Sequence, residues 1–291
     1  MHYTISNESL QITVDEKGAQ LLSVLGSDGT EYLWQGDPEF WGDRSPNLFP
    51  YVGRMPGETY YMDKREYHMP IHGFANFQLF RLVEQSKTAL LFELTDNPDT
   101  YAMYPRHFAY RVRYQLEGSC LQVEYSVENR DERVLHFGLG GHPGFRVPLA
   151  DGLAFEDYRL RFGTARKPLR VEFDSKCFVL DERTPFPLTD DTILPLSHDL
   201  FDQDAIFLQD ISNSVTLETP LDSHGLTMDF WGCKYLGFWH KPHAPAPYVC
   251  IEPWTSLPSR SGIVEHLETQ PDLLHLDPGG RFQAGWNITV F

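Results

Sequence analysis

The chain of 291 residues is 41% hydrophobic and 14% aromatic, which is ample for a packed core and compatible with one domain. Its formal net charge of -17 disfavours binding to nucleic acid or to an anionic membrane surface. The N-terminal residues lack the basic and apolar segments of a signal peptide, and no stretch approaches the roughly 20 apolar residues that span a bilayer. The four cysteines, at positions 120, 177, 233 and 250, are dispersed, which favours reduced thiols over a disulfide framework. We therefore expect a cytoplasmic protein that binds neither nucleic acid nor membrane.

Short apolar runs separated by turn residues predict a protein built almost wholly of strands. In chain order, we expect strands over residues 10–14, 19–26, 31–35, 89–95, 110–116, 121–127, 158–162, 214–219, 226–230, 235–240, 248–254 and 285–291. The strongest signal is the alternation of apolar and polar residues on both sides of Glu117-Gly118-Ser119, which is typical of a hairpin with one buried face. Helical periodicity is confined to one or two turns near 263–267. These patterns predict an all-β fold with very little helix, two large packed antiparallel sheets and a single domain over residues 1–291.

The stretch HFGLGGHPGFRVPL, residues 136–149, places His142 between Gly140-Gly141 and Pro143-Gly144. Glycine permits backbone conformations closed to other residues, whereas Pro143 fixes its own φ and biases His142 toward an extended conformation. A strand can therefore end abruptly here and hold the imidazole of His142 in one fixed orientation. Such a histidine suits a proton donor or a sugar ligand, and it equally suits a simple bend in which the ring satisfies a backbone group.

Glu252 follows the apolar run 248–251 and precedes Pro253-Trp254. A carboxylate at the end of a strand, beside a large aromatic side chain, loses part of its hydration, which raises its pKa toward the range of a general base. The alternative is a solvated acid at a strand end. The apolar run directly before Glu252 favours burial.

Three further residues have the chemistry to bind an oxygen-rich ligand. Arg54 lies in the Pro- and Gly-rich loop 46–57 and offers five fixed N–H donors. His72 precedes Gly73 in a turn-like segment, and Asp204 directly precedes the apolar run 205–208. Each also has a plain alternative, namely a surface arginine, a turn histidine and an aspartate that caps a turn, so none of them identifies a site by itself.

Other chemistries have little support in the sequence. His240 and His243 suggest a pair of metal ligands, but Pro242 interrupts them and no ligand cluster accompanies them. The sequence has no P-loop, no dinucleotide-binding glycine motif and no Gly-x-Ser-x-Gly elbow, and nothing local supports a cysteine nucleophile. We therefore expect neither a bound metal nor a cofactor.

Five short motifs, taken in order, resemble the aldose 1-epimerase (galactose mutarotase) family, and most of all its bacterial branch associated with lactose and galactose operons. They are Gly53-Arg54, His72-Gly73, Gly141-His142-Pro143, Asp204 and Glu252-Pro253-Trp254. The resemblance extends from Ile5 to the C-terminus, essentially the whole chain. It implies a β-supersandwich of the galactose mutarotase-like type, with the sugar bound in an open cleft on one sheet.

The same resemblance implies a role for each site residue. Glu252 would be the general base that takes the proton of the anomeric hydroxyl, and His142 the general acid that protonates the ring oxygen, so that the C1–O5 bond opens and recloses as the other anomer. Arg54 and His72 would hydrogen-bond substrate oxygens, and Asp204 would orient ring hydroxyls. Such a protein would be a monomer or a homodimer, and its partner would be a small sugar. Candidate stacking surfaces for the pyranose ring are Phe74, Trp231, Trp239 and Trp254.

The sequence departs from the better-known mutarotases at three points, which leaves the identity of the sugar open. Met55-Pro56 follow Arg54 in place of an Asn-Arg pair, Gly144-Phe145 stand in place of Tyr-Trp, and Asp204 lacks a Tyr-Asp-His context. A hexose-6-phosphate mutarotase is one alternative, and it needs basic residues near the pocket. A glycosidase with Glu252 and Asp204 as its carboxylate pair is another, although nearby histidines suit anomer exchange better. A carbohydrate-binding or sensing protein without catalysis is the third.

Overall fold

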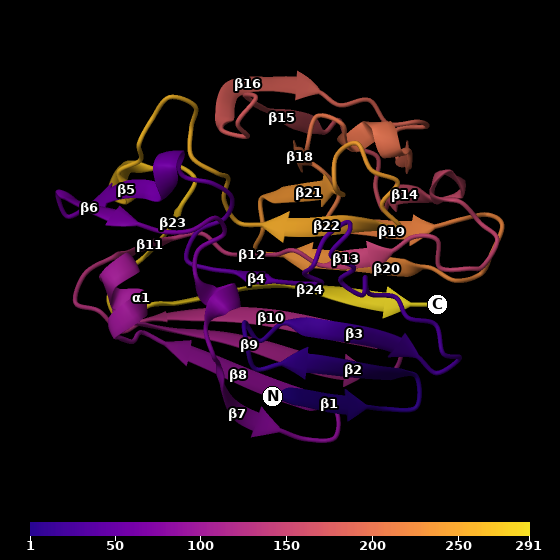
Figure 1. The fold of residues 1–291 in the computed structure, drawn as a ribbon, viewed down its shortest axis with the longest axis horizontal. Coiled ribbons are helices and arrows are strands. Elements are labelled where there is room, and N and C mark those ends of the chain that lie inside the picture. The colour runs from indigo at the N-terminus through magenta and orange to yellow at the C-terminus, as the bar shows by residue number, and fades with distance from the viewer.

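Two large antiparallel sheets form the body of the computed structural model, which describes residues 1–291 (Figure 1). The larger sheet has nine strands, in the order β17 (Ile193–Pro195), β14 (Arg159–Phe162), β19 (Ser214–Glu218), β20 (Leu226–Trp231), β24 (Arg281–Val290), β10 (Cys120–Asn129), β9 (Phe108–Glu117), β8 (Ala89–Thr95) and β7 (Arg81–Gln85). The second sheet has eight strands, in the order β16 (Val179–Pro185), β15 (Leu169–Phe173), β18 (Ile206–Gln209), β21 (Tyr235–Trp239), β22 (Tyr248–Trp254), β12 (Gly140–Gly141) and β4 (Asn47–Leu48), with β13 (Gly144–Arg146) also paired to β22.

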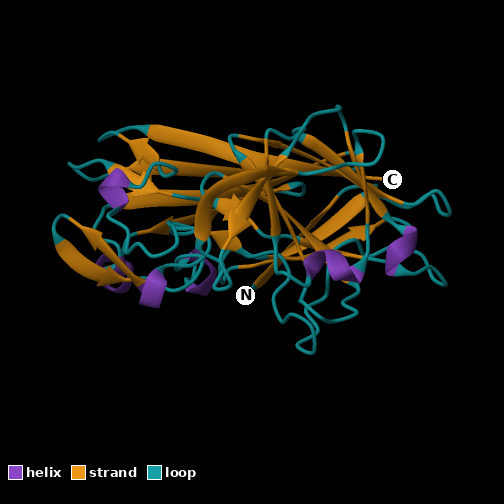
Figure 2. Cartoon of the chain, turned by 90° about the horizontal axis from the view of Figure 1, so that it is seen from above, coloured by secondary structure: helices purple, strands orange, loops and turns teal.

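Three small sheets and a few short helical segments complete the fold, and Figure 2 shows how far strands outweigh helices. The small sheets are β1 (His2–Ser6) with β2 (Leu10–Asp15) and β3 (Leu21–Gly26), β5 (Thr59–Met62) with β6 (Arg65–His68), and β11 (Leu135–Phe137) with β23 (Leu274–Leu276). One α-helix, α1 (Pro98–Met103), is accompanied by single-turn 3-10 helices over Pro56–Glu58, Ala75–Phe77, Phe155–Asp157, His198–Phe201 and Leu267–Thr269. None of these helices has the length and apolar character that crossing a bilayer requires. The expectation of an antiparallel β-sandwich with very little helix is confirmed.

The main hydrophobic core draws on both large sheets. It joins side chains of β9 and β24, such as Tyr114 and Trp286, with side chains of β21 and β22, such as Phe238 and Ile251. Alternate residues of a strand point to opposite faces, so Ile251 enters this core while its neighbour Glu252 points to the other face. All seven residues of β22 are nevertheless buried, which explains why this strand reads as an almost continuous apolar run.

The hairpin around Gly118 is confirmed, and apart from residues 31–35 each expected strand overlaps a strand of the structure. Glu117 pairs with Cys120 at the end of the hairpin, and Gly118 has the positive φ of 56° that the turn requires. The segment 31–35 makes only isolated bridges, because its backbone bonds alternately to two different neighbours: Tyr32 N–H donates to Val24 O, and Trp34 N–H donates to Gly144 O.

Residues 263–266, where the sequence has weak helical periodicity, are not helical, and a single 3-10 turn, Leu267–Thr269, begins at the end of that segment. A short α-helix that was not predicted occurs elsewhere. Glu265 O accepts a hydrogen bond from Tyr61 N–H, so this backbone pairs with β5 instead of forming helical hydrogen bonds within its own segment. The helix α1 begins after Asn97, whose side chain accepts from the N–H groups of Asp99 and Thr100 in a capping box. Six residues are too short for an apolar period to show, so only the cap signal was available in the sequence.

Candidate active site

The pairing of β22 with β12 and β13 brings His142 and Glu252 together. Gly140 pairs with Trp254 and Gly144 pairs with Cys250, so His142 falls opposite Glu252 midway between these two pairs. The ladder stays closed across this gap, because Ile251 N–H donates to Pro143 O at 3.1 Å. Two residues 110 positions apart in the sequence are therefore placed by one strand register.

Glycines surround His142 because the neighbouring side chains leave no space for a Cβ atom. A Cβ on Gly140 would lie 2.5 Å from Trp254 Cδ1, and a Cβ on Gly144 would lie 2.9 Å from Trp41 Cζ3. On the core side, a Cβ on Gly141 would lie 2.6 Å from the indole nitrogen of Trp286. None of the three has a positive φ, so close packing, and not the conformational freedom expected from the sequence, explains these glycines.

A cavity of about 460 Å³ opens above this part of the sheet. Five residues singled out from the sequence for a role in chemistry or polar binding line it: Arg54, His72, His142, Asp204 and Glu252. They come from five separate parts of the chain, and the cavity brings all five together. Their catalytic and binding roles remain predictions.

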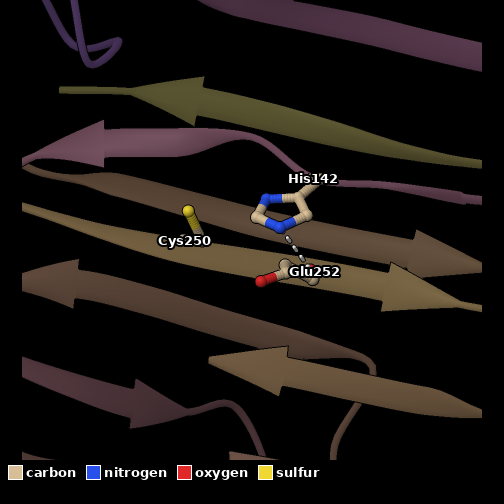
Figure 3. Close-up of side chains that lie close together, drawn as sticks. All are labelled: His142, Cys250 and Glu252. Atoms are coloured by element: carbon tan, nitrogen blue, oxygen red, sulfur yellow. Dashed lines mark ion pairs between the residues drawn. The ribbon is translucent and has the colours of Figure 1, made fainter. Parts of the chain in front are cut away.

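His142 and Glu252 form a buried pair at the cavity (Figure 3). His142 Nε2 lies 3.3 Å from Glu252 Oε2, and the two side chains are only 10% and 1% exposed. Burial, together with the charge of Asp204, raises the pKa of Glu252 well above its usual value. Burial lowers the pKa of His142 well below its usual value. Both shifts favour the uncharged state of the pair, a carboxylic acid beside a neutral imidazole.

His72 is held by two hydrogen bonds with the backbone of Gly53, one through its own backbone and one through its ring. His72 N–H donates to Gly53 O at 2.9 Å, and Gly53 N–H donates to His72 Nδ1 at 3.1 Å. Burial, with the nearby charge of Arg54, lowers the pKa of His72 to about 4, so its ring is neutral at pH 7. Since Nδ1 accepts, Nε2 carries the proton and is a hydrogen-bond donor. His72 also has a φ of 66°, an uncommon backbone conformation for a residue other than glycine that is concentrated at functional sites.

Asp204 and Arg54 form a second polar group in the cavity. Arg54 Nη2 lies 3.9 Å from Asp204 Oδ2, and the Cys177 thiol donates to the same oxygen at 3.0 Å. The other oxygen of Asp204 accepts from Ala205 N–H, and Asp204 itself has a φ of 73°. The carboxylate is therefore fixed in direction just before β18, where it is able to accept from a ligand hydroxyl.

Aromatic side chains form the walls of the cavity. Trp239, expected from the sequence, and Trp254 both line it, and so does Trp41, which the sequence analysis missed. Trp41 stacks at a tilt on His142 with ring centroids 4.9 Å apart, and it meets Trp239 edge-on at 5.6 Å. One signal for Trp41 was present in the sequence, namely Gly144, which stands where the better-known mutarotases have a tyrosine. The small residue leaves the space that the Trp41 ring fills.

Phe74 and Trp231 do not reach the cavity, so they are withdrawn as stacking surfaces. Phe74 is 1% exposed and packs in the core against Phe49 and Phe108, because the chain turns inward after Gly73. Trp231 lies on β20 in the nine-stranded sheet, opposite Gly285 of β24, and is 37% exposed. The sequence around an aromatic residue on a strand does not indicate to which of the two sheets the strand belongs. Trp231 was for this reason wrongly expected at the cavity.

The cavity matches the chemistry of a polyhydroxylated ligand. Four polar atoms of its lining residues have no hydrogen-bond partner within the protein: Asn76 Oδ1, His142 Nδ1, Glu252 Oε2 and Trp254 Nε1. Buried polar groups are usually paired, so such a concentration indicates a site for hydroxyl groups. Asn76 was not predicted as a site residue, because it lies in a 3-10 turn that has no motif of its own.

Comparison with known proteins identifies the family. A family model described as aldose 1-epimerase matches residues 1–289. The chain belongs to the aldose 1-epimerase family. The resemblance stated from the five motifs is thereby confirmed.

Relatives of this aldose 1-epimerase family member match it from end to end. Two LacX proteins of Lactococcus lactis subsp. lactis, one plasmid-borne and one chromosomal, are each 31% identical over 299 residues, covering 100% of this chain and 99% of theirs. The crystal structure of a galactose mutarotase related enzyme from Lactobacillus acidophilus is 33% identical with a TM-score of 0.94, covering 100% of this chain and 97% of its own. A galactose mutarotase-like protein from Lactobacillus casei is 30% identical with a TM-score of 0.94 and full coverage of both chains.

Proposed function

We propose that the protein is an aldose 1-epimerase that interconverts the α and β anomers of a free hexose by acid–base ring opening and reclosure. The observation that carries this proposal is the buried contact of 3.3 Å between His142 Nε2 and Glu252 Oε2 at the cavity. Anomer exchange needs one group that accepts the O1 proton and one that donates a proton to O5, and it needs no cofactor. The pair supplies both groups within reach of one anomeric centre.

The number of protons on the pair stays constant during ring opening. Glu252 as carboxylate takes the proton of O1 while His142 as imidazolium gives a proton to O5, so the pair becomes a carboxylic acid and a neutral imidazole. Reclosure on the other face of the aldehyde returns both protons. Burial shifts both pKa values toward the uncharged state, so the protein favours the protonation state that accompanies the open-chain sugar.

The remaining lining residues hold the sugar. His72 Nε2–H and Arg54 are donors for ring oxygens and hydroxyls, and Asp204 is an acceptor. Trp41, Trp239 and Trp254 present apolar faces for the C–H surface of the pyranose. Holding the anomeric centre against the pair supplies much of the rate enhancement that such a reaction needs.

The charges of the lining favour a free sugar over a phosphorylated one. Three acidic residues, Asp43, Asp204 and Glu252, line the cavity with a single guanidinium, that of Arg54, and no lysine. A phosphate group would add negative charge to this set, and phosphate sites are usually built from several basic groups or backbone N–H groups. We therefore expect glucose 6-phosphate to be a poor substrate.

Polarimetry or NMR of freshly dissolved α-D-galactose and α-D-glucose tests the proposal. The wild type should speed anomer equilibration, and Glu252→Gln and His142→Asn should each lower the rate by about 100-fold or more. Trp231→Ala is the matched control because Trp231 lies outside the cavity. If sugars bind measurably while equilibration stays at the uncatalysed rate, the protein is a carbohydrate-binding protein and not an epimerase.

A further inference from the structure

Cys250 is the neighbour of the His142–Glu252 pair that the acid–base chemistry does not use. It lies two residues before Glu252 on β22, so both side chains point to the same face of the sheet. The side chain of Cys250 is completely buried, and it belongs to a small aromatic cluster with Trp34 and Tyr248. Figure 3 shows the His142 ring, on the segment between β12 and β13, facing Glu252 of β22, with Cys250 next to them on the same strand.

The three side chains offer one ligand atom each within a small volume. The imidazole nitrogen of His142, the sulfur of Cys250 and a carboxylate oxygen of Glu252 all lie within 4.8 Å of one another. Ligands about 2.0–2.1 Å from a tetrahedral Zn²⁺ are separated by about 3.3 Å, which is the observed distance between His142 Nε2 and Glu252 Oε2. Sulfur at about 2.3 Å from the ion needs a separation of about 3.6 Å from the nitrogen and the oxygen, which is inside the 4.8 Å within which the three atoms lie.

We propose that His142, Cys250 and Glu252 form a three-ligand site for a Zn²⁺-class transition metal ion, with the fourth position open to the cavity. Imidazole and thiolate select Zn²⁺ and Co²⁺ over Mg²⁺ and Ca²⁺, which prefer oxygen ligands. A dication bound by one thiolate, one carboxylate and one neutral imidazole gives a cluster without net charge, as a buried site requires. Glu252 Oε2 has no hydrogen-bond partner within the protein, so a metal takes it without breaking an existing bond.

Occupation of this site would inhibit the protein. A metal on Glu252 and His142 removes the base and the acid together, so sugar turnover and metal binding exclude each other. This inhibitory consequence rests on the proposed function, whereas the metal site itself does not. The site then adds a sensitivity to free transition metals that the acid–base reaction alone would not have.

Cobalt spectroscopy of the full chain, freed of metal by a chelator, tests the site directly. One equivalent of Co²⁺ should give a near-ultraviolet thiolate-to-cobalt charge-transfer band in the wild type, and the band should be lost in Cys250→Ser and reduced in His142→Asn. Cys177→Ser is the matched control, because Cys177 is the thiol that lines the cavity and it donates to Asp204. A wild type without the band, or a band that survives in Cys250→Ser, would falsify the site. Circular dichroism establishes that each variant is folded, and Cys250→Ala replaces Cys250→Ser if the latter is not.

Zinc inhibition gives the second readout. Zn²⁺ should suppress anomer equilibration by the wild type reversibly, and Cys250→Ser should raise the half-inhibiting Zn²⁺ concentration at least about tenfold. If equilibration is catalysed but no cobalt band forms, the metal site fails and the proposed function stands. If the band forms and depends on Cys250 while no sugar is turned over, the proposed function fails and the metal site stands.

Discussion

Gly141→Ala should destabilise the protein by about 2–4 kcal/mol, because the added methyl group has no space on the core side of β12. Its Cβ would lie 2.6 Å from Trp286 Nε1 and 2.8 Å from the Tyr125 hydroxyl. Those two groups are bonded to each other, since the indole N–H donates to the hydroxyl oxygen at 2.9 Å, and Tyr125 donates in turn to Asn47 Oδ1 at 3.0 Å. Overpacking costs about 1–3 kcal/mol, and each buried hydrogen bond that breaks costs about 1 kcal/mol more.

Urea unfolding at neutral pH measures this loss, and anomer equilibration measures its effect on His142. Gly42→Ala is the matched control: Gly42 is exposed, its φ is not positive, and nothing lies within 4 Å of its Cβ position, so its free energy of unfolding should stay within about 0.5 kcal/mol of wild type. In a Trp286→Phe background the cost of Gly141→Ala should shrink by about 1 kcal/mol or more, because the crowded indole nitrogen is gone. A Gly141→Ala protein as stable as Gly42→Ala would refute the close-packing explanation.

Three further outcomes follow from the site. Glu252→Gln should be more stable than wild type above pH 4.5, and the difference should grow by up to about 1.4 kcal/mol per pH unit. The reason is that the pKa of Glu252 is raised in the folded protein, so the wild type loses stability as the pH rises toward that pKa. Equal free energies of unfolding at pH 7 in urea titrations would contradict this expectation. Trp41→Ala should raise the KM for the sugar roughly five- to thirty-fold through lost stacking, about 1–2 kcal/mol, with Trp231→Ala unchanged. Burial lowers the pKa of His240 from 6.5 to about 4, so the wild type should lose up to about 3 kcal/mol through this group as pH falls across that range. His240→Gln should show a shallower acid loss in unfolding titrations, and identical slopes would exclude His240 as the cause.

The alternation of apolar and polar residues predicted the strands well where one face of the strand is buried and the other is exposed to solvent. The hairpin of β9 and β10 is the clearest example, because Tyr110 to Leu116 alternate regularly with polar residues. Very short strands such as β12 and β4 have two residues each, and no pattern exists at that length. β12 is placed by its pairing with β22, and β4 by its pairing with β12, which is tertiary information.

Five titratable residues of the site were predictable, whereas Asn76 and Trp41 were not, and two of the four expected stacking residues lie outside the cavity. Arg54, His72 and Asp204 stand beside glycines or at the start of an apolar run, and the turn or strand end there aims each side chain at the cavity. Stacking residues have no such local pattern, since the sequence around a tryptophan does not distinguish a core, an outer face and a cleft. Trp239 and Trp231 are eight residues apart in similar surroundings, and only the sheet to which each belongs separates them.

The ladder that holds Glu252 opposite His142 also separates the rigid part of the site from the adaptable part. Opening the floor requires breaking backbone bonds of a central, fully buried strand, so its amide hydrogens should exchange with solvent as slowly as those of the core. The rim contains exposed Ile71, in a turn, and exposed Phe77, at the end of the 3-10 helix Ala75–Phe77, and neither belongs to that strand. Under the proposed function, changes at the rim would alter the preference among sugars, while the strand register would keep the spacing of His142 and Glu252 constant.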